Sequence, residues 1–255
     1  MVHSEAHATG LRRWCLFLDV DGTLLEPAAT PEAVNVPPEL RVRLAVLADA
    51  FEGALALISG RTLASLDVLF APLSLPAAGS HGLQRRDARG QLHGAASADT
   101  RLAPAREALK VLVHQHPGLL LEDKSGSLAL HFRRAPELAA LAQSQTLRVA
   151  SGLGEPFMVL EGDHVFEIKP RQPDKGAAVA AFMDEAPFRG RLPVFVGDDH
   201  TDSDAMAVIK RRGGLTIAVG DRISADRQLA NPRAVRRWLG SLLLSGDPLQ
   251  GDTPP

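Results

Sequence analysis

Two carboxylates spaced two residues apart follow an apolar strand near the start of the chain. The segment Leu16-Phe17-Leu18-Asp19-Val20-Asp21-Gly22 points Asp19 and Asp21 the same way if the strand continues through Val20. Gly22 permits a sharp exit that leaves both carboxylates at the strand end. Two like charges this close repel each other unless a cation or a shared proton relieves the repulsion. Three interpretations follow: a Mg²⁺ site, an acid/base pair, or an acidic surface turn.

Later polar residues should join this pair at one edge of a sheet. Ser59, Asp198 and Asp199 each come directly after an apolar strand, and Lys175 stands at the start of a predicted helix. The carboxyl ends of parallel strands meet at the edge where such folds bind ligands. The group would combine carboxylates, a hydroxyl, an ammonium and a helix N-terminus, without Cys or a His pair. Those donors favour a phosphate site with Mg²⁺ over a zinc site.

The elements that must position these residues alternate along the chain. Apolar runs predict strands over 16–18, 54–58, 194–196 and 215–219. Helical spacing of apolar residues predicts helices over 40–51 and 63–70, around 206–209, and from 232 onward. This alternation predicts an α/β fold with a Rossmann-like parallel-sheet core and helices on both faces.

Between about residues 86 and 168 the pattern changes to helix, two strands, helix, two strands. This change predicts an inserted α+β cap domain, an open-faced sheet covered by helices on one side. We therefore expect a discontinuous core over 11–85 and 169–245 and a cap over 86–168. The tails 1–10 and 246–255 are polar or rich in Pro and Gly and are expected to be disordered.

Alternation along the cap strands gathers ionisable side chains on the face opposite the apolar one. These residues are Glu122, Lys124, His131, Arg133 and Glu167. A face of mixed charge is commonly just a solvated one. An insert that returns near the carboxyl ends of the core strands is also well placed to cover a site there. The cap therefore has two interpretations, a solvated face or a substrate-binding face.

Composition narrows the class of protein. The 255-residue chain has a net charge of -2 and no Lys/Arg block, which argues against a nucleic-acid or anionic-membrane partner. Its single cysteine, Cys15, excludes an internal disulfide framework and suggests a buried thiol. The polar first ten residues lack a secretory signal, and no run approaches 18 apolar residues. We expect a cytoplasmic protein with neither membrane insertion nor an evident obligate protein partner.

The motifs, taken in order, resemble those of haloacid dehalogenase-type phosphatases, and their combination resembles the trehalose-6-phosphate phosphatase family. The core motifs are Asp19-Val20-Asp21-Gly22-Thr23, Ile58-Ser59-Gly60-Arg61, Lys175-Gly176 and Gly197-Asp198-Asp199-His200-Thr201-Asp202. The insert matches through Gly79-Ser80-His81-Gly82, Leu121-Glu122-Asp123-Lys124, Leu130-His131-Phe132-Arg133 and Phe166-Glu167-Ile168-Lys169-Pro170. The resemblance spans roughly residues 15–243.

The resemblance implies distinct roles for the two opening carboxylates. Asp19 would attack phosphorus and form an aspartyl-phosphate, while Asp21 would protonate the leaving sugar oxygen and later activate water. Mg²⁺, held by Asp19, the Asp21 backbone carbonyl and Asp198, would shield the phosphate charge from the attacking carboxylate.

Further residues acquire roles from the same resemblance. Ser59, the Gly60 backbone and Lys175 would bind the phosphoryl oxygens. Asp199 and Asp202 would orient metal-bound waters and Lys175.

In the cap, the five ionisable side chains would face the glucosyl hydroxyls of a small-molecule sugar phosphate. Glu122, Lys124 and Glu167 are favoured over Arg133 for this task. For His81, a place at the core edge and a ligand role stay open.

The implied reaction is Mg²⁺-dependent hydrolysis of trehalose 6-phosphate to trehalose and phosphate, the last step of trehalose biosynthesis. Two alternatives stay open: the same chemistry on sucrose phosphate or a glycosyl phosphoglycerate, and a non-catalytic phosphosugar-binding regulatory domain. The chain departs from the family pattern at Ser203, where the family usually has Glu, and at Asp163-His164, where it often has Lys before the Val. The first departure leaves Asp19 and Asp198 untouched.

Overall fold

The computed structural model describes residues 10–28, 34–94, 99–124 and 126–250, which divide into two compact units. The core unit contains residues 10–28, 34–93 and 174–250. The cap unit contains the described residues between 94 and 173. Within the described residues, the chain leaves the core after His93 and returns to it at Asp174, as an inserted cap requires.

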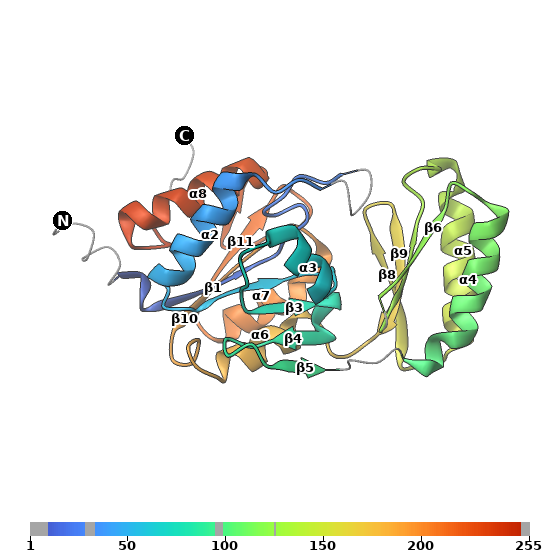
Figure 1. Cartoon of the computed structure of the whole chain (residues 1–255), viewed down its shortest axis with the longest axis horizontal. Helices are drawn as coiled ribbons and strands as arrows, with labels where there is room; N and C mark the ends of the chain where they lie inside the picture. Colours follow the sequence, from blue (N-terminus) through green and yellow to red (C-terminus); the bar gives the residue numbers. More distant parts are fainter. Residues whose placement is uncertain (1–9, 29–33, 95–98, 125, 251–255) are drawn as a thin grey trace. The chain divides into compact units, whose positions relative to one another are not determined.

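The core is built on one eight-stranded sheet with the order β12-β11-β10-β1-β2-β3-β4-β5 (Figure 1). The strands are β1 (Trp14–Leu18), β2 (Leu55–Ile58), β3 (Ala77–Gly79), β4 (Gln84–Arg86), β5 (Leu92–Gly94), β10 (Leu192–Gly197), β11 (Leu215–Val219) and β12 (Arg227–Leu229). Strands β12 to β3 run parallel, and β4 pairs antiparallel with β3. The parallel part confirms the predicted Rossmann-like architecture.

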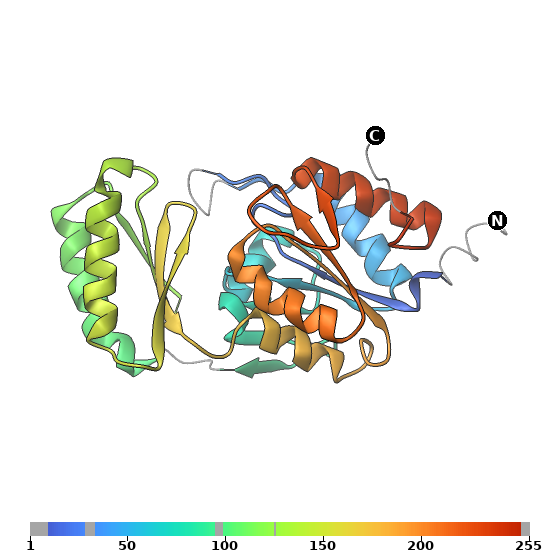
Figure 2. The same ribbon diagram turned by 180° about the vertical axis from the view of Figure 1, so that it is seen from behind.

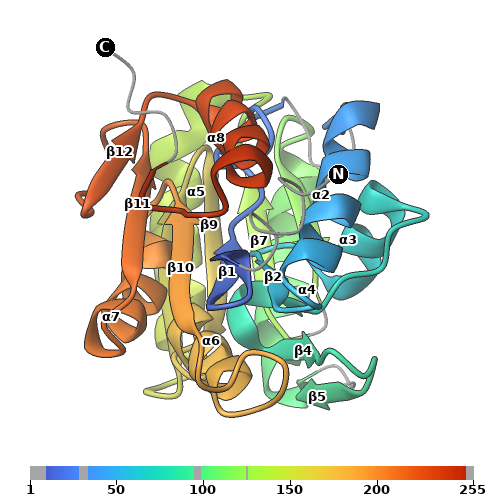
Figure 3. The same cartoon turned by 90° about the vertical axis from the view of Figure 1, so that its left-hand side faces the viewer.

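Helices lie on both faces of this sheet. They are α2 (Pro38–Ala50), α3 (Leu63–Phe70), α6 (Lys175–Met183), α7 (Ser203–Arg211) and α8 (Pro232–Ser245). Helices α2 and α8 pack together on one face, and α6 and α7 pack together on the other (Figure 3). Thr62, Asp174 and Asn231 cap α3, α6 and α8 by accepting a backbone N–H through their side chains.

The central strands are buried on both faces, which explains their continuous apolar runs. In β1, Cys15, Leu16, Phe17 and Leu18 are buried, and the Phe17 ring stacks on Phe188 at 5.3 Å between centroids. Strand β1 lies between β10 and β2 in the sheet. Its carboxyl end, where Asp19 follows, is therefore fixed by pairing on both sides.

The cap unit is an antiparallel sheet backed by two helices (Figure 2). Its elements are α4 (Ala103–Gln115), β6 (Leu120–Asp123), β7 (Leu128–His131), α5 (Ala139–Ser151), β8 (Phe157–Gly162) and β9 (Val165–Pro170), with the strand order β6-β7-β9-β8. Leu128, Leu130, Phe166 and Ile168 lie in the apolar core with Leu109 of α4. The order of elements and the helix-covered face agree with the predicted α+β cap.

The cap unit begins later than expected from the sequence. Strands β4 and β5 extend the core sheet, although the predicted insert began at residue 86. Arg86 is held on the core because its guanidinium pairs with Asp67 at 2.7 Å and donates to the Leu75 carbonyl. Most of the two predicted tails lies outside the described residues, but Gly246 ends α8 in a left-handed conformation. No helix in the described residues is both long and apolar enough to cross a membrane.

Candidate active site

The loop after β1 turns back sharply at its glycine. The Asp19 N–H donates to the Val196 carbonyl of β10 at 3.0 Å, which continues the parallel pairing beyond the strand. Gly22 then adopts φ +83°, and a side chain at this position would overlap the Asp198 carboxylate. Glycine is therefore required both for the turn and for the close approach of the β1 and β10 loops. Thr23 donates to Asp198 Oδ1 at 3.2 Å and holds the two loops together.

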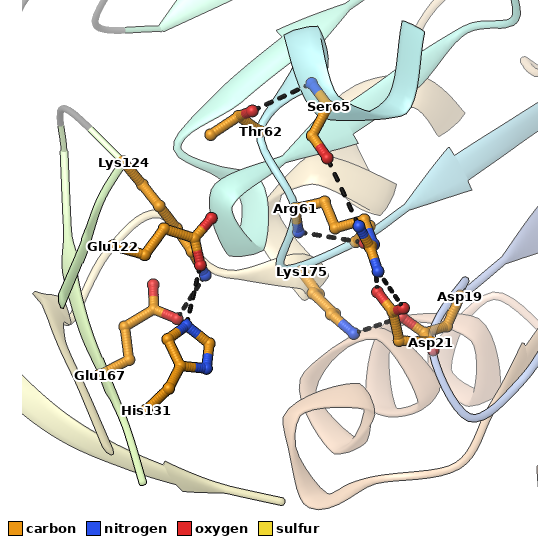
Figure 4. A network of polar contacts seen from close by, with 11 residues as sticks. Asp19, Asp21, Arg61, Thr62, Ser65, Glu122, Lys124, His131, Glu167 and Lys175 are labelled. Carbon is orange, nitrogen blue, oxygen red and sulfur yellow. Dashed lines mark hydrogen bonds and ion pairs between the residues drawn. The ribbon is translucent and has the colours of Figure 1, made fainter. Parts of the chain in front are cut away.

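Lys175 links the two strand ends through a buried ion-pair network. Its ammonium donates to Asp19 Oδ1 at 2.8 Å and to Asp202 Oδ1 at 2.7 Å. All three side chains are buried, and Figure 4 shows Lys175 directed at Asp19. Because Lys175 is the first residue of α6, the Asp174 cap also fixes the start of the helix from which this ammonium extends.

Asp202 uses both of its carboxylate oxygens within the site. While Oδ1 accepts from Lys175, Oδ2 accepts the backbone N–H groups of Asp198 and Asp199 at 3.0 and 3.1 Å. The side chain of Asp199 accepts the N–H of His200 at 2.6 Å and caps the short 3₁₀ turn that follows β10. Asp202 thus orients Lys175, whereas Asp199 shapes its own loop.

The site fits a hard cation. Carboxylate oxygens of Asp19, Asp198 and Asp202 lie within 4.8 Å of one another, and one ammonium offsets only part of their charge. Burial, with the nearby charges of Asp202 and Asp198, raises the pKa of Asp19 well above its ordinary value. Burial and the charge of Asp202 likewise raise the pKa of Asp198 to about 6. A bound divalent cation would relieve this repulsion, and all of these donors are oxygens of the type Mg²⁺ prefers.

The loop after β2 brings an arginine to the second opening carboxylate. Arg61 donates through Nε to Asp21 Oδ2 and through Nη2 to Asp21 Oδ1, both at 2.7 Å (Figure 4). The backbone N–H of the same residue donates to Ser59 Oγ at 3.1 Å, and Ser59 is buried. Arg61 stands in a motif noted from the sequence but was given no role there. Its position two residues after Ser59, in the same loop, was the available signal.

Gly60 lies under the ring of His81. A side chain at Gly60 would come within 2.6 Å of His81 Cε1 and Nε2. His81 therefore lies at the core edge, where its ring contacts the loop proposed to bind phosphate.

The open face of the cap holds a buried network around Glu167. Lys124 Nζ donates to Glu167 Oε2 at 2.9 Å, and Ser127 Oγ donates to Glu167 Oε1 at 2.6 Å. All three residues are buried. In the sheet register, Ala129 of β7 stands opposite both Glu122 of β6 and Glu167 of β9, which places the two glutamates on the same face. Ser127 was not among the cap residues expected from the sequence to form the site.

A second pair on this face is more accessible. His131 Nε2 lies 3.0 Å from Glu122 Oε2, with 19% and 32% of the two side chains exposed (Figure 4). Burial would raise the pKa of Glu122, but the hydrogen bond with His131 and the charge of Lys124 outweigh it and hold that pKa below its ordinary value. Arg133 does not join this group, because it pairs with Asp163 in the turn between β8 and β9.

A family model described as trehalose-phosphatase matches residues 17–234 of the chain. The chain belongs to the trehalose-phosphatase family. Trehalose-6-phosphate phosphatase of Escherichia coli is 41% identical over 228 residues, which is 89% of this chain and 85% of that protein. A probable trehalose-phosphate phosphatase of Sinorhizobium fredii is 42% identical over 248 residues, 94% of this chain and 91% of that protein. The chain is thus a phosphatase, and the non-catalytic alternative is set aside.

The fold of this family member is also found among solved structures. The C-terminal domain of Candida albicans trehalose-6-phosphate phosphatase superposes with a TM-score of 0.79 at 23% identity, over 94% of this chain and 96% of that chain.

Of the two departures from the family pattern, Asp163-His164 has a structural account. Asp163 pairs with Arg133 and with His164, which holds φ +59° in the turn. Ser203 opens α7, and nothing in the structure explains the replacement of Glu.

Proposed function

We propose that this phosphatase hydrolyses trehalose 6-phosphate to trehalose and phosphate through an aspartyl-phosphate on Asp19, with Mg²⁺ as cofactor. The observation that carries the proposal is the buried contact of Lys175 with Asp19 and Asp202 at the carboxyl end of the core sheet. A carboxylate beside an ammonium can approach a phosphate dianion, because the ammonium offsets part of the repulsion between the two anions. Membership of the trehalose-phosphatase family supports the choice of substrate.

In this mechanism Asp19 Oδ2 attacks phosphorus, because Oδ1 accepts from Lys175 and keeps a second lone pair with which it would hold the metal ion. Asp21 carries the proton to the leaving sugar oxygen and then takes one from the attacking water. The bidentate contact with Arg61 orients Asp21 for this exchange, and one of its two bonds must open to free a carboxylate oxygen for the proton. Ser59, the Gly60 backbone and Lys175 bind the phosphoryl oxygens.

Asp19, Asp198 and the Asp21 backbone carbonyl would hold the metal ion. Bound there, Mg²⁺ supplies positive charge that lets one anion approach another. Asp202 is unsuited to direct ligation because both of its oxygens are already engaged, and it positions Lys175 and the Asp198 loop instead. Asp199 supports the same loop through His200.

For the cap we propose a division of labour among the predicted sugar ligands. Glu122 and His131 are partly exposed and can exchange hydrogen bonds with glucosyl hydroxyls. Glu167 and Lys124 are buried against each other and present a fixed polar surface beside that pair. Arg133 is assigned to the turn with Asp163, and we no longer include it among the sugar ligands.

The experiment that tests this function is phosphate release from a panel of sugar phosphates with Mg²⁺ and with EDTA. Trehalose 6-phosphate should give the highest kcat/KM, and EDTA should abolish release until Mg²⁺ is restored. A preference for sucrose phosphate or a glycosyl phosphoglycerate would replace the substrate and keep the chemistry. Full activity in EDTA would contradict the metal site.

The cytoplasmic location expected from the sequence stays a prediction.

A further inference from the structure

Two consecutive residues other than glycine adopt a left-handed backbone conformation after β3. Ser80 has φ +49°, His81 has φ +55°, and Gly82 follows with φ +97°. Such angles are uncommon outside glycine, and a pair of them persists only where the surrounding structure holds it. Strained backbone of this kind is found mainly at functional sites, so the segments that contact this turn indicate what it does.

The strained turn is hydrogen-bonded to the loop after β2. The Ser80 N–H donates to the Arg61 carbonyl at 2.7 Å, and the His81 N–H donates to the Ser59 carbonyl at 3.0 Å. These two acceptors stand on either side of Gly60. The ring of His81 fills the space where a side chain on Gly60 would be, with Cε1 and Nε2 within 2.6 Å of that position. Gly60 is thus held by two backbone bonds and one ring.

The same turn contacts the start of α6. A side chain at Gly82 would overlap the carbonyl of Asp174 and would lie 3.3 Å from the backbone nitrogen of Lys175. The turn therefore contacts both the Gly60 loop and the start of α6, the two segments that carry the groups proposed to bind the same phosphate: the Gly60 backbone and the Lys175 ammonium. The hydroxyl of Ser80 is buried and makes no hydrogen bond within the described residues, so that side chain does not hold the turn.

We propose that His81 is a positioning residue for phosphoryl transfer. Its left-handed backbone and its ring together fix the Gly60 N–H relative to Lys175. The proposal rests on the phosphate site described above, but it does not depend on which sugar the phosphate carries. Misplacement of a transition-state contact by about 1 Å can cost roughly 100-fold in rate. The strain at this turn is thus maintained for catalysis and contributes little to folding.

The test compares His81→Gly and His81→Phe with wild type. Glycine relieves the backbone strain and removes the ring, whereas phenylalanine keeps a planar ring without nitrogens. The matched control is Glu52→Gly, since Glu52 is another left-handed residue, with φ +52°, and its side chain is 46% exposed in surface ion pairs. Each variant is measured for kcat and KM on trehalose 6-phosphate and p-nitrophenyl phosphate, for inhibition by orthovanadate, and for thermal unfolding.

His81→Gly should lower kcat on both substrates by about 10- to 100-fold and weaken orthovanadate inhibition, while its unfolding midpoint stays within about 2 °C of wild type. His81→Phe should recover much of the loss, and Glu52→Gly should keep full activity.

Three results would overturn the proposal. A large fall in the unfolding midpoint with unchanged orthovanadate affinity would make His81 merely structural. A loss confined to trehalose 6-phosphate would make it a sugar ligand. Equal inactivity of the Phe and Gly variants would make the ring nitrogens the active groups. Activity on a different sugar phosphate would revise the proposed substrate without touching these comparisons.

Discussion

The guanidinium of Arg61 donates two hydrogen bonds of 2.7 Å to the carboxylate of Asp21, while its own backbone N–H donates to Ser59 Oγ. One residue thus connects the proposed acid/base with the proposed phosphate loop. Only 10% of the Arg61 side chain is exposed to solvent. Two parallel bonds to a planar carboxylate fix its orientation.

Arg61→Ala should therefore impair the steps in which Asp21 moves a proton. We expect kcat on trehalose 6-phosphate to fall roughly 10- to 100-fold, which is less than the loss of the acid–base group itself would cost because Arg61 only orients that group. The fall should be smaller on p-nitrophenyl phosphate, whose leaving group needs little protonation. Added guanidinium should restore part of the loss. Because both residues act together, Arg61→Ala should cost little in an Asp21→Asn background. Equal losses on both substrates, without rescue, would remove the link to Asp21.

Asp19→Asn should abolish turnover with the fold intact. The amide matches the carboxylate in size but cannot attack phosphorus. Steady-state phosphate release should fall below detection on every substrate, while the circular dichroism spectrum stays unchanged. The matched variant is Asp67→Asn, which alters an exposed carboxylate at the Arg86 ion pair and should leave turnover unaffected. Near-normal turnover by Asp19→Asn would rule out its role as nucleophile.

Lys175→Met should affect stability in a way that depends on the metal. Removing the ammonium leaves Asp19 and Asp202 buried without their shared cation, a change that typically costs about 3–5 kcal/mol. Mg²⁺ should bind the enriched negative charge and recover part of that loss, so its addition should raise the unfolding midpoint more in the variant than in wild type. Urea titrations at matched Mg²⁺ concentrations measure the difference. An equal Mg²⁺ shift in both proteins would contradict the shared charge cluster.

The sequence predicted the strand ends because the signals there are local. An apolar run buried on both faces reads as a parallel strand, and the residue after it must reach the carboxyl edge, as Asp19 and Asp198 do. The pairing of Arg61 with Asp21 was not predictable in the same way. It joins side chains 40 residues apart through rotamers that depend on the packed loops. Likewise, strands β4 and β5 carry weak apolar patterns, and they are assigned to the core only because β4 pairs with β3 and β5 follows β4 in the sheet.

In the cap, Ser127→Ala should loosen Glu167 and reduce discrimination among substrates. The lost bond is 2.6 Å long, buried, and made to a carboxylate, a type that contributes about 1.5–3 kcal/mol. We expect kcat/KM on trehalose 6-phosphate to fall about tenfold, with little change on p-nitrophenyl phosphate, which has no sugar for the cap to bind. Thr146→Val is the matched control, because Thr146 is a buried cap hydroxyl without a hydrogen-bond partner in the described residues. The same selective loss in both variants would indicate general loosening of the cap.

Cys15 should resist thiol reagents in the folded protein. Burial raises its pKa to about 12, with Arg191 offsetting part of the effect, and its Sγ lies 3.4 Å from Met183 Sδ. At pH 8 its thiolate population should be on the order of a thousandfold below that of an unfolded cysteine. As pH rises above about 8.5, the unfolded thiol loses its proton while the folded one keeps it, so the free energy of unfolding falls. Ellman's reagent should react slowly with native protein and at once in urea, whereas rapid native labelling would contradict the buried position of β1.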